Sequence, residues 1–135
     1  MRSEVIVPIS IGPKALSLTS RRGRKKIAID RIIRMEADSN YTCIHIMDQR
    51  PVLMARVLGD YEAVLEPFGF VRTHRSHLVN RQYVRDINTS GEIIMIDQSK
   101  AEISRRKRKT VLGILNLAYS GKHADIPFKG INIAG

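Results

Sequence analysis

Residues 70–81 have the sequence FVRTHRSHLVNR, in which apolar residues are interleaved with side chains that form hydrogen bonds. The first five predict a strand, because successive side chains of a strand point to opposite faces. If Phe70 faces the core, Arg72 and His74 lie on the same face. His74 is then better explained as a hydrogen-bonded structural histidine than as a ligand.

The middle of this stretch predicts a loop that follows the strand. Arg75, Ser76 and His77 offer hydrogen-bond donors in a row, and Arg75 is expected to point outward. Proteins often place their binding residues on such loops. We therefore expect this loop to contact a partner.

The segments on both sides predict a mainly β fold, an elongated arrangement of small antiparallel sheets. Runs rich in β-branched and aromatic residues alternate with turn signals such as residues 38–40, Asp-Ser-Asn. Such runs occur at 15–19, 26–29, 32–37, 41–47, 52–55, 83–88, 92–96 and 100–103.

Two other segments have the apolar spacing of an amphipathic helix. A short internal helix is expected at 57–65, with Asp60 available to cap its start. A C-terminal helix is expected to begin after Ser104, a good N-cap, and to end at Gly121.

The composition fits one globular domain. The chain has 135 residues, 43% of them hydrophobic and 27% charged. We expect the domain at 14–118, between a leader at 1–13 and a tail at 119–135. Because Cys43 is the single cysteine and no apolar stretch is long enough to span a bilayer, we expect a cytoplasmic protein.

The net charge of +10 comes from three short segments. Segments 21–26, 69–85 and 105–109 contain 14 of the 23 basic residues and no acidic residue, whereas the rest of the chain has more acidic than basic residues. Such local positive charge favours a polyanionic partner, and the excess of Arg over Lys favours nucleic acid. The alternative for any single run is a solvated basic turn.

The last basic run coincides with the predicted start of the C-terminal helix. Cations there oppose the helix dipole, whereas free backbone N–H groups at a helix N-terminus attract anions. We expect a phosphate group to bind at this point. The alternative is that solvent and salt screen the unfavourable charge.

No sequence pattern supports catalysis. Four histidines, at positions 45, 74, 77 and 123, coexist with Ser76 and Cys43, but no nucleophile elbow, zinc-protease helix or phosphate-binding glycine loop surrounds them. One cysteine cannot build a structural zinc site. We predict no enzyme activity, no metal, no cofactor and no small-molecule substrate.

The order of several landmarks identifies a known pattern. IIRMEA at 32–37 leads to NYT at 40–42, the helix and residues 70–80 follow, and ISRR lies at 103–106. Over about residues 14–117 the chain resembles the LytTR-type DNA-binding domain of bacterial transcription regulators. One departure is DQR at 48–50, where a glycine is common in the family.

The resemblance implies a sequence-specific regulator that binds double-stranded DNA. Domains of this type insert loops into successive major grooves, and two copies bind a direct-repeat promoter site and bend it. Too few residues precede the domain for a receiver, so an unknown regulatory protein is a candidate second partner. The alternatives are a basic protein that associates with RNA and an interaction module that binds an acidic protein.

Carried over position by position, the resemblance also assigns candidate DNA-binding residues. We expect Arg75 and Arg106 at base edges, and Asn80 to hold a turn beside the core residues Leu78 and Val79. The full set is Ser39, Asn40, Tyr41, His74, Arg75, Ser76, Ser104, Arg105 and Arg106, with Lys107, Arg108 and Arg24 on phosphates.

Overall fold

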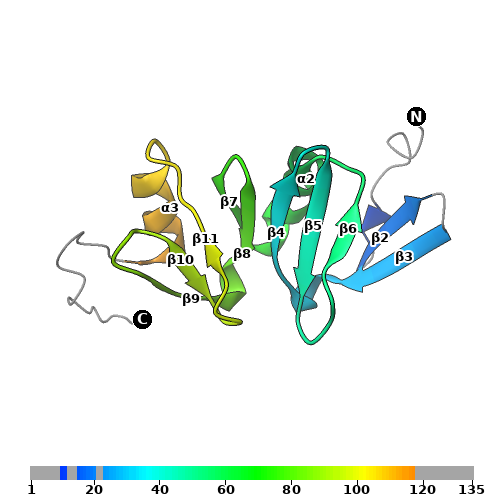
Figure 1. The fold of residues 1–135 in the computed structure, drawn as a ribbon, viewed down its shortest axis with the longest axis horizontal. Helices are drawn as coiled ribbons and strands as arrows, with labels where there is room; N and C mark the ends of the chain where they lie inside the picture. The colour runs from blue at the N-terminus through cyan, green and yellow to red at the C-terminus, as the bar shows by residue number, and fades with distance from the viewer. Residues whose placement is uncertain (1–9, 12–14, 21–22, 118–135) are drawn as a thin grey trace.

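A five-stranded antiparallel sheet lies at the middle of the molecule (Figure 1). The computed structural model describes residues 10–11, 15–20 and 23–117. The strand order is β6, β5, β4, β8, β7, so β4 is central and pairs with β5 and β8. The strands are β4 Ile32–Asp38, β5 Tyr41–Ile46, β6 Val52–Met54, β7 Phe70–His74 and β8 His77–Asn80.

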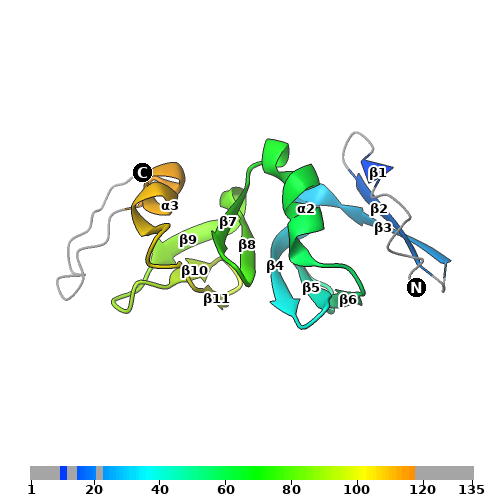
Figure 2. The same ribbon diagram turned by 90° about the horizontal axis from the view of Figure 1, so that it is seen from above.

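Two three-stranded sheets flank the central sheet and make the molecule elongated (Figures 1 and 2). One contains β1 Ser10–Ile11, β2 Ala15–Ser20 and β3 Gly23–Ala28. The other contains β9 Val84–Ile87, β10 Ile93–Met95 and β11 Lys100–Ala101. The predicted mainly β class is therefore confirmed. The rest of the predicted leader and the predicted tail at 119–135 lie outside the described residues.

Two α-helices complete the fold. Helix α2, Leu58–Leu65, connects β6 to β7, and α3, Arg108–Leu115, follows β11. Short 3-10 turns occur at Ile29–Arg31, Glu66–Phe68 and Arg81–Tyr83. Neither α-helix is long and apolar enough to cross a membrane.

The strands at the centre contribute to two separate cores. Ile32 and Leu78 belong to a cluster that also contains the buried residues of α2, whereas their neighbours Ile33 and Val79 belong to a cluster with the buried residues of α3. Adjacent residues of a strand point to opposite faces, so one sheet can supply both cores. The prediction that Phe70, Leu78 and Val79 are core residues is correct.

Strand β8 was not expected from the sequence. All four of its residues are buried, including His77, which was predicted to lie on a loop. A strand that is buried on both faces lacks the alternation of polar and apolar residues that marks a half-exposed strand. The loop between β7 and β8 is therefore reduced to Arg75 and Ser76.

Both helices begin differently from the prediction. Val57 is the N-cap of α2, and Asp60 lies inside the helix, where its carboxylate is 3.3 Å from a guanidinium nitrogen of Arg56. The Ser104 hydroxyl accepts a hydrogen bond from the N–H of Lys107 at 3.3 Å, which forms a turn before α3. As a result, α3 starts at residue 108, and only the last two cations of the basic run lie within it.

The end of α3 is also earlier than expected. The helix stops at Leu115 because Asn116 adopts a left-handed conformation with φ of 59°, and the prediction that it continues to Gly121 was wrong. The apolar stripe of the helix is confirmed, since Val111 and Leu115 are buried in the core that also contains Ile33 and Val79.

Candidate nucleic-acid interface

Three connecting segments lie along one edge of the molecule, at the top of Figure 1. They are the turn between β4 and β5, the turn between β7 and β8, and the segment that joins β11 to α3. Together they contain every candidate DNA-binding residue except Arg24, His74 at the end of β7, Tyr41 at the start of β5 and Arg108 at the start of α3. The structure therefore brings together residues that are up to 68 positions apart in the sequence, from Ser39 to Lys107.

Hydrogen bonds fix the three segments relative to one another. The N–H of Ala37 on β4 donates to the carbonyl of Ser76 at 2.9 Å. On the other side, the Thr73 hydroxyl donates to the carbonyl of Glu102 at 2.8 Å, and the N–H of Ser104 donates to the carbonyl of Thr73 at 2.9 Å. Thr73 is fully buried, so the donor side of this link is shielded from water.

The turn between β7 and β8 is held by Arg72. Its guanidinium donates to the carbonyl of His74 at 2.9 Å and to that of Arg75 at 2.6 Å, and it pairs with Glu62 of α2 at 2.7 Å. The ring nitrogen Nδ1 of His74 accepts a hydrogen bond from the N–H of Ser76 at 3.1 Å. The backbone of the turn is thus fixed, and the side chain of Arg75 is exposed.

The expectation that His74 is a hydrogen-bonded histidine is therefore correct. Arg72, in contrast, has a role that was not predicted from the sequence. Its partners are Glu62, ten residues upstream on α2, and the carbonyls of His74 and Arg75 at the following turn. No local spacing in the sequence marks these residues as one group.

The segment that leads into α3 exposes its cations unequally. Arg105 and Arg106 are exposed, whereas Lys107 and Arg108 are half-buried. The guanidinium of Arg108 lies over Gly91, where a Cβ atom would be 3.0 Å from it. The first two arginines are consequently the more accessible.

The turn between β4 and β5 presents three exposed side chains. Ser39 has a φ of 57°, which tightens the turn, and Asn40 and Tyr41 follow it. Tyr41 is 45% exposed, a high value for an aromatic side chain in a strand. Arg24 is also exposed, but it lies on β3 in the sheet at the right end of Figure 1. It does not share the edge that carries the three turns.

A partly buried ion pair braces β4 behind this edge. Arg34 is 7% exposed, donates from Nε to the hydroxyl of Ser99 at 2.9 Å and pairs with Glu36 at 3.0 Å. Burial alone would raise the pKa of Glu36, but the hydrogen bond and charge of Arg34 hold this pKa below its usual value. Glu36 is therefore ionised at neutral pH and keeps the pair intact.

Burial and the charge of Arg34 lower the pKa of His45, whose Nε2 is 3.6 Å from Glu36. Burial also lowers the pKa of His77. Both imidazoles are therefore neutral at pH 7.

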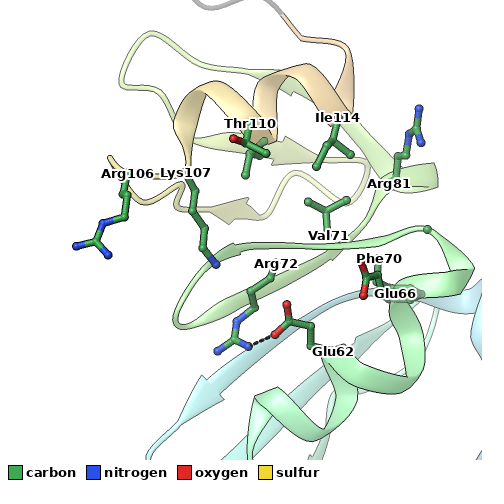
Figure 3. Close-up of a pocket in the computed structure, with 12 residues that line it drawn as sticks. Glu62, Glu66, Phe70, Val71, Arg72, Arg81, Arg106, Lys107, Thr110 and Ile114 are labelled. Carbon is green, nitrogen blue, oxygen red and sulfur yellow. Dashed lines mark hydrogen bonds and ion pairs between the residues drawn. The ribbon is translucent and has the colours of Figure 1, made fainter.

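A cleft of about 450 Å³ opens between α2 and α3 (Figure 3). Arg106 and Lys107 lie on one side of it, and Glu62 and Glu66 lie on the other, with Arg72 extending toward Glu62. An anion is attracted to the basic side and repelled by the carboxylates of the other side, of which Glu62 is paired with Arg72. The positive side is continuous with the edge that carries the three turns.

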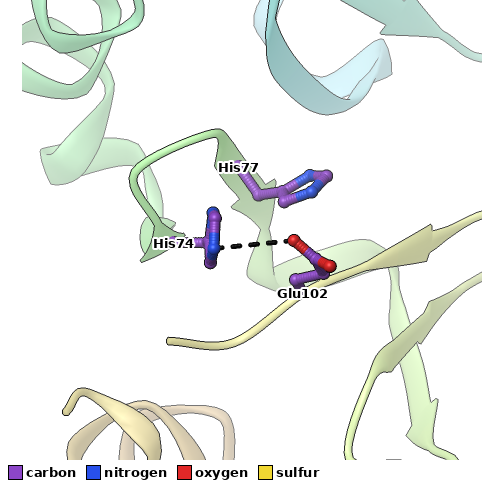
Figure 4. A group of neighbouring side chains, drawn as sticks. All are labelled: His74, His77 and Glu102. Carbon is purple, nitrogen blue, oxygen red and sulfur yellow. Dashed lines mark ion pairs between the residues drawn. The ribbon is translucent and has the colours of Figure 1, made fainter. Parts of the chain in front are cut away.

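One side-chain cluster at this edge has the composition of a metal site (Figure 4). Ligand atoms of His74, His77 and Glu102 lie within 4.8 Å of one another. No metal was predicted from the sequence, and no local pattern places Glu102 beside the two histidines.

The comparisons with known proteins agree with this architecture. Residues 22–116 match the family model described as the LytTr DNA-binding domain. The fold is similar to the LytTr DNA-binding domain of a methyl-accepting/DNA response regulator from Bacillus cereus, with a TM-score of 0.65 and 18% identity, over 77% of this chain and 98% of that one.

Two curated relatives come from Paraburkholderia xenovorans strain LB400. They are the heme-containing CO-sensing transcriptional regulators RcoM 1 and RcoM 2, which are 33% and 32% identical to this chain over 92 residues. The match includes 62% of this chain but 34% of each relative. The chain thus spans about a third of the length of the curated relatives it matches.

Proposed function

The chain belongs to the LytTR family of DNA-binding domains, and on that premise we propose that it is a sequence-specific transcription regulator that binds double-stranded DNA. The observation that carries the proposal is the single edge on which three turns present exposed polar and basic residues. The hydrogen bonds from Thr73 and Ala37 support it further, because preorganised contact groups lose little entropy on binding. We propose residues 14–118 as the DNA-binding unit.

Base recognition is assigned to two exposed arginines of the edge. A guanidinium forms two hydrogen bonds with the O6 and N7 atoms of guanine, so Arg75 and Arg106 are the proposed base contacts. Both are exposed, and the backbone under Arg75 is fixed by Arg72. Asn40 and Arg105 contact bases or phosphates.

The remaining candidates position the protein on the DNA backbone. Lys107, Arg108 and Arg24 contact phosphates, which adds affinity without adding sequence information. Polar side chains in or next to the three turns complete the contacts, at Ser39, Tyr41, His74, Ser76 and Ser104. Because Arg24 lies on the end sheet, its phosphate is expected at the margin of the binding site.

The turns are proposed to enter the major groove, with two copies of the protein on a direct repeat. The elongated row of sheets supports this arrangement, since its turns face the same way along the length of the molecule (Figure 1). The same geometry gives no reason for a two-fold axis between the copies. A direct repeat is therefore preferred to a palindrome.

Selection of bound sites from a random duplex library tests the proposal. We expect recovery of a spaced direct repeat, bound at least about 10³-fold more tightly than random duplex. Equal binding of single-stranded RNA would favour the alternative of a basic protein that associates with RNA. Recovery of no sequence preference overturns the proposal. The affinity should also fall steeply with salt, because phosphate contacts release counterions.

Three variants then separate base contacts from phosphate contacts. Arg75→Ala should cost about 1–3 kcal/mol on the selected site and little on random duplex, whereas Lys107→Ala should weaken both alike. Arg50→Ala is the matched control, because Arg50 is exposed on the loop between β5 and β6 at the opposite edge (Figure 1). If Arg75→Ala and Lys107→Ala behave identically, the division of roles is wrong.

A further inference from the structure

We propose that His74, His77 and Glu102 form a binding site for a divalent transition metal ion of the Zn²⁺ class. The three ligand atoms already lie within 4.8 Å of one another. Two imidazoles and one carboxylate suit Zn²⁺, Co²⁺, Ni²⁺ and Fe²⁺, whereas Mg²⁺ and Ca²⁺ prefer oxygen ligands. His74 is shared with the proposed DNA contacts, whereas the proposed base contacts Arg75 and Arg106 are not ligands of this site.

The strand pairing places the two histidines together. His74 ends β7, His77 begins β8, and the two residues are partners in the antiparallel register. Their ring centroids are 5.7 Å apart. The two-residue turn sets the two backbones opposite each other, so both rings can reach a common point.

Glu102 completes the group from a distant part of the sequence. Its carboxylate oxygen lies 3.5 Å from Nε2 of His74, and the three side chains converge in Figure 4. The backbone of Glu102 is fixed by the hydrogen bond from Thr73, so its side chain projects from a rigid position. The three ligands therefore come from elements that are already fixed relative to one another.

An unsatisfied atom points to a missing ligand. His77 is 7% exposed, and its Nδ1 is buried without a hydrogen-bond partner. Buried polar atoms are nearly always paired, because leaving one unpaired forfeits its hydration without replacement. A metal ion at the centre of the cluster supplies the partner that the protein does not.

An open hollow beside the cluster provides access for the ion. It has a volume of about 610 Å³ and includes His74 and Glu102 in its lining, together with Glu92, Arg105 and Arg108. Three protein ligands leave coordination positions that water entering from this hollow would fill.

Coordination by His74 would change the turn that carries Arg75. In the structure, Nδ1 of His74 accepts the N–H of Ser76 at 3.1 Å, so the proton of the neutral ring is on Nε2, which faces Glu102. If Nε2 binds the metal, this proton leaves and Nδ1 must carry one, and the bond from Ser76 is lost. Occupancy of the site is therefore directly visible at the Ser76 amide.

Titration of tag-free, chelator-treated protein with ZnCl2 in the absence of DNA tests the site. We expect one ion per chain by calorimetry, a shift of the Ser76 amide resonance, and a cobalt spectrum typical of nitrogen and oxygen ligands. Glu102→Gln and His74→Gln should each weaken zinc binding at least tenfold. Glu102 is exposed, so its variant should fold even if a change at the buried His77 does not.

His45→Gln is the matched control, because this half-buried histidine lies outside the cluster and its variant should bind zinc like the wild type. The proposal is overturned if the wild type does not bind zinc stoichiometrically. It is also overturned if the Glu102 and His74 variants bind zinc as tightly as the wild type. Since no DNA is present, the result is independent of the proposed regulator function.

Discussion

The hydroxyl of Thr73 donates a hydrogen bond to the main-chain carbonyl of Glu102 at 2.8 Å, across 29 residues of sequence. The reciprocal backbone bond from Ser104 to the carbonyl of Thr73 makes β7 and the segment before α3 one unit. Two of the three turns on the proposed DNA-binding edge thus depend on a single buried residue.

Thr73→Val keeps the shape of the side chain and removes the donor. We expect a loss of about 1–3 kcal/mol in the free energy of unfolding, because the carbonyl of Glu102 loses its partner in a buried setting. Urea unfolding measures the change as a lower midpoint with an unchanged m value. Thr73→Ser retains the hydroxyl and should lose clearly less. No loss in Thr73→Val together with a clear loss in Thr73→Ser would mean that packing of the methyl group, not the hydrogen bond, stabilises this link.

His45→Gln should make stability less sensitive to acid. The pKa of His45 is lowered in the folded state, so between the two pKa values the unfolded state binds more protons than the folded state. The stability of the wild type therefore falls as the pH decreases below about 6.5, the usual histidine value. Urea unfolding from pH 7.5 to pH 5 measures the slope, which should be smaller in the variant. An unchanged slope would mean that the lowered pKa of His45 is not the source of this pH dependence. The ion pair between Arg34 and Glu36 should be present in both proteins.

Asn116 should be replaceable by glycine but not by alanine. Its φ of 59° closes α3 in the left-handed region, which glycine adopts without strain. We expect Asn116→Gly to be more stable than Asn116→Ala by about 1–2 kcal/mol, the cost of that region for a residue with a Cβ. Thermal unfolding of the two variants measures the difference. Equal stability would show that the left-handed cap does not constrain the end of the helix.

Lys109→Glu should stabilise α3. Lys109 lies in the first turn of the helix and is exposed, so its charge opposes the helix dipole with little shielding by the protein. Reversal of this charge should add about 0.3–1 kcal/mol at low salt and less at high salt. Lys100→Glu is the control, because it changes the net charge equally on an exposed strand residue. A gain of the same size in the control would attribute the effect to net charge alone.

Much of the fold was predictable because its elements carry local signals. The runs at 15–19, 32–37 and 41–47 correspond to β2, β4 and β5, and the helix at 57–65 corresponds to α2. Strand β8 was missed because burial on both faces removes the alternation on which a strand prediction depends.

The candidate interface was predictable only in part. The exposed position of Arg75, Arg105 and Arg106 follows from their place in turns between apolar segments. The support given by Arg72 and by Arg34 was not predictable, since the latter reaches Ser99, 65 residues away, and such partners are chosen by packing.

The sequence alone determined the class of the fold, the three basic segments and the turns that carry them, because each depends on residues within a few positions of one another. The tertiary structure decided that the β4–β5 turn, the β7–β8 turn and the segment before α3 share one edge, that the central sheet supplies two cores, and that Glu102 meets His74 and His77. The reason is physical: the position of one turn relative to another is set by strand pairing and buried hydrogen bonds such as that of Thr73, and these join residues with no local relationship in the chain.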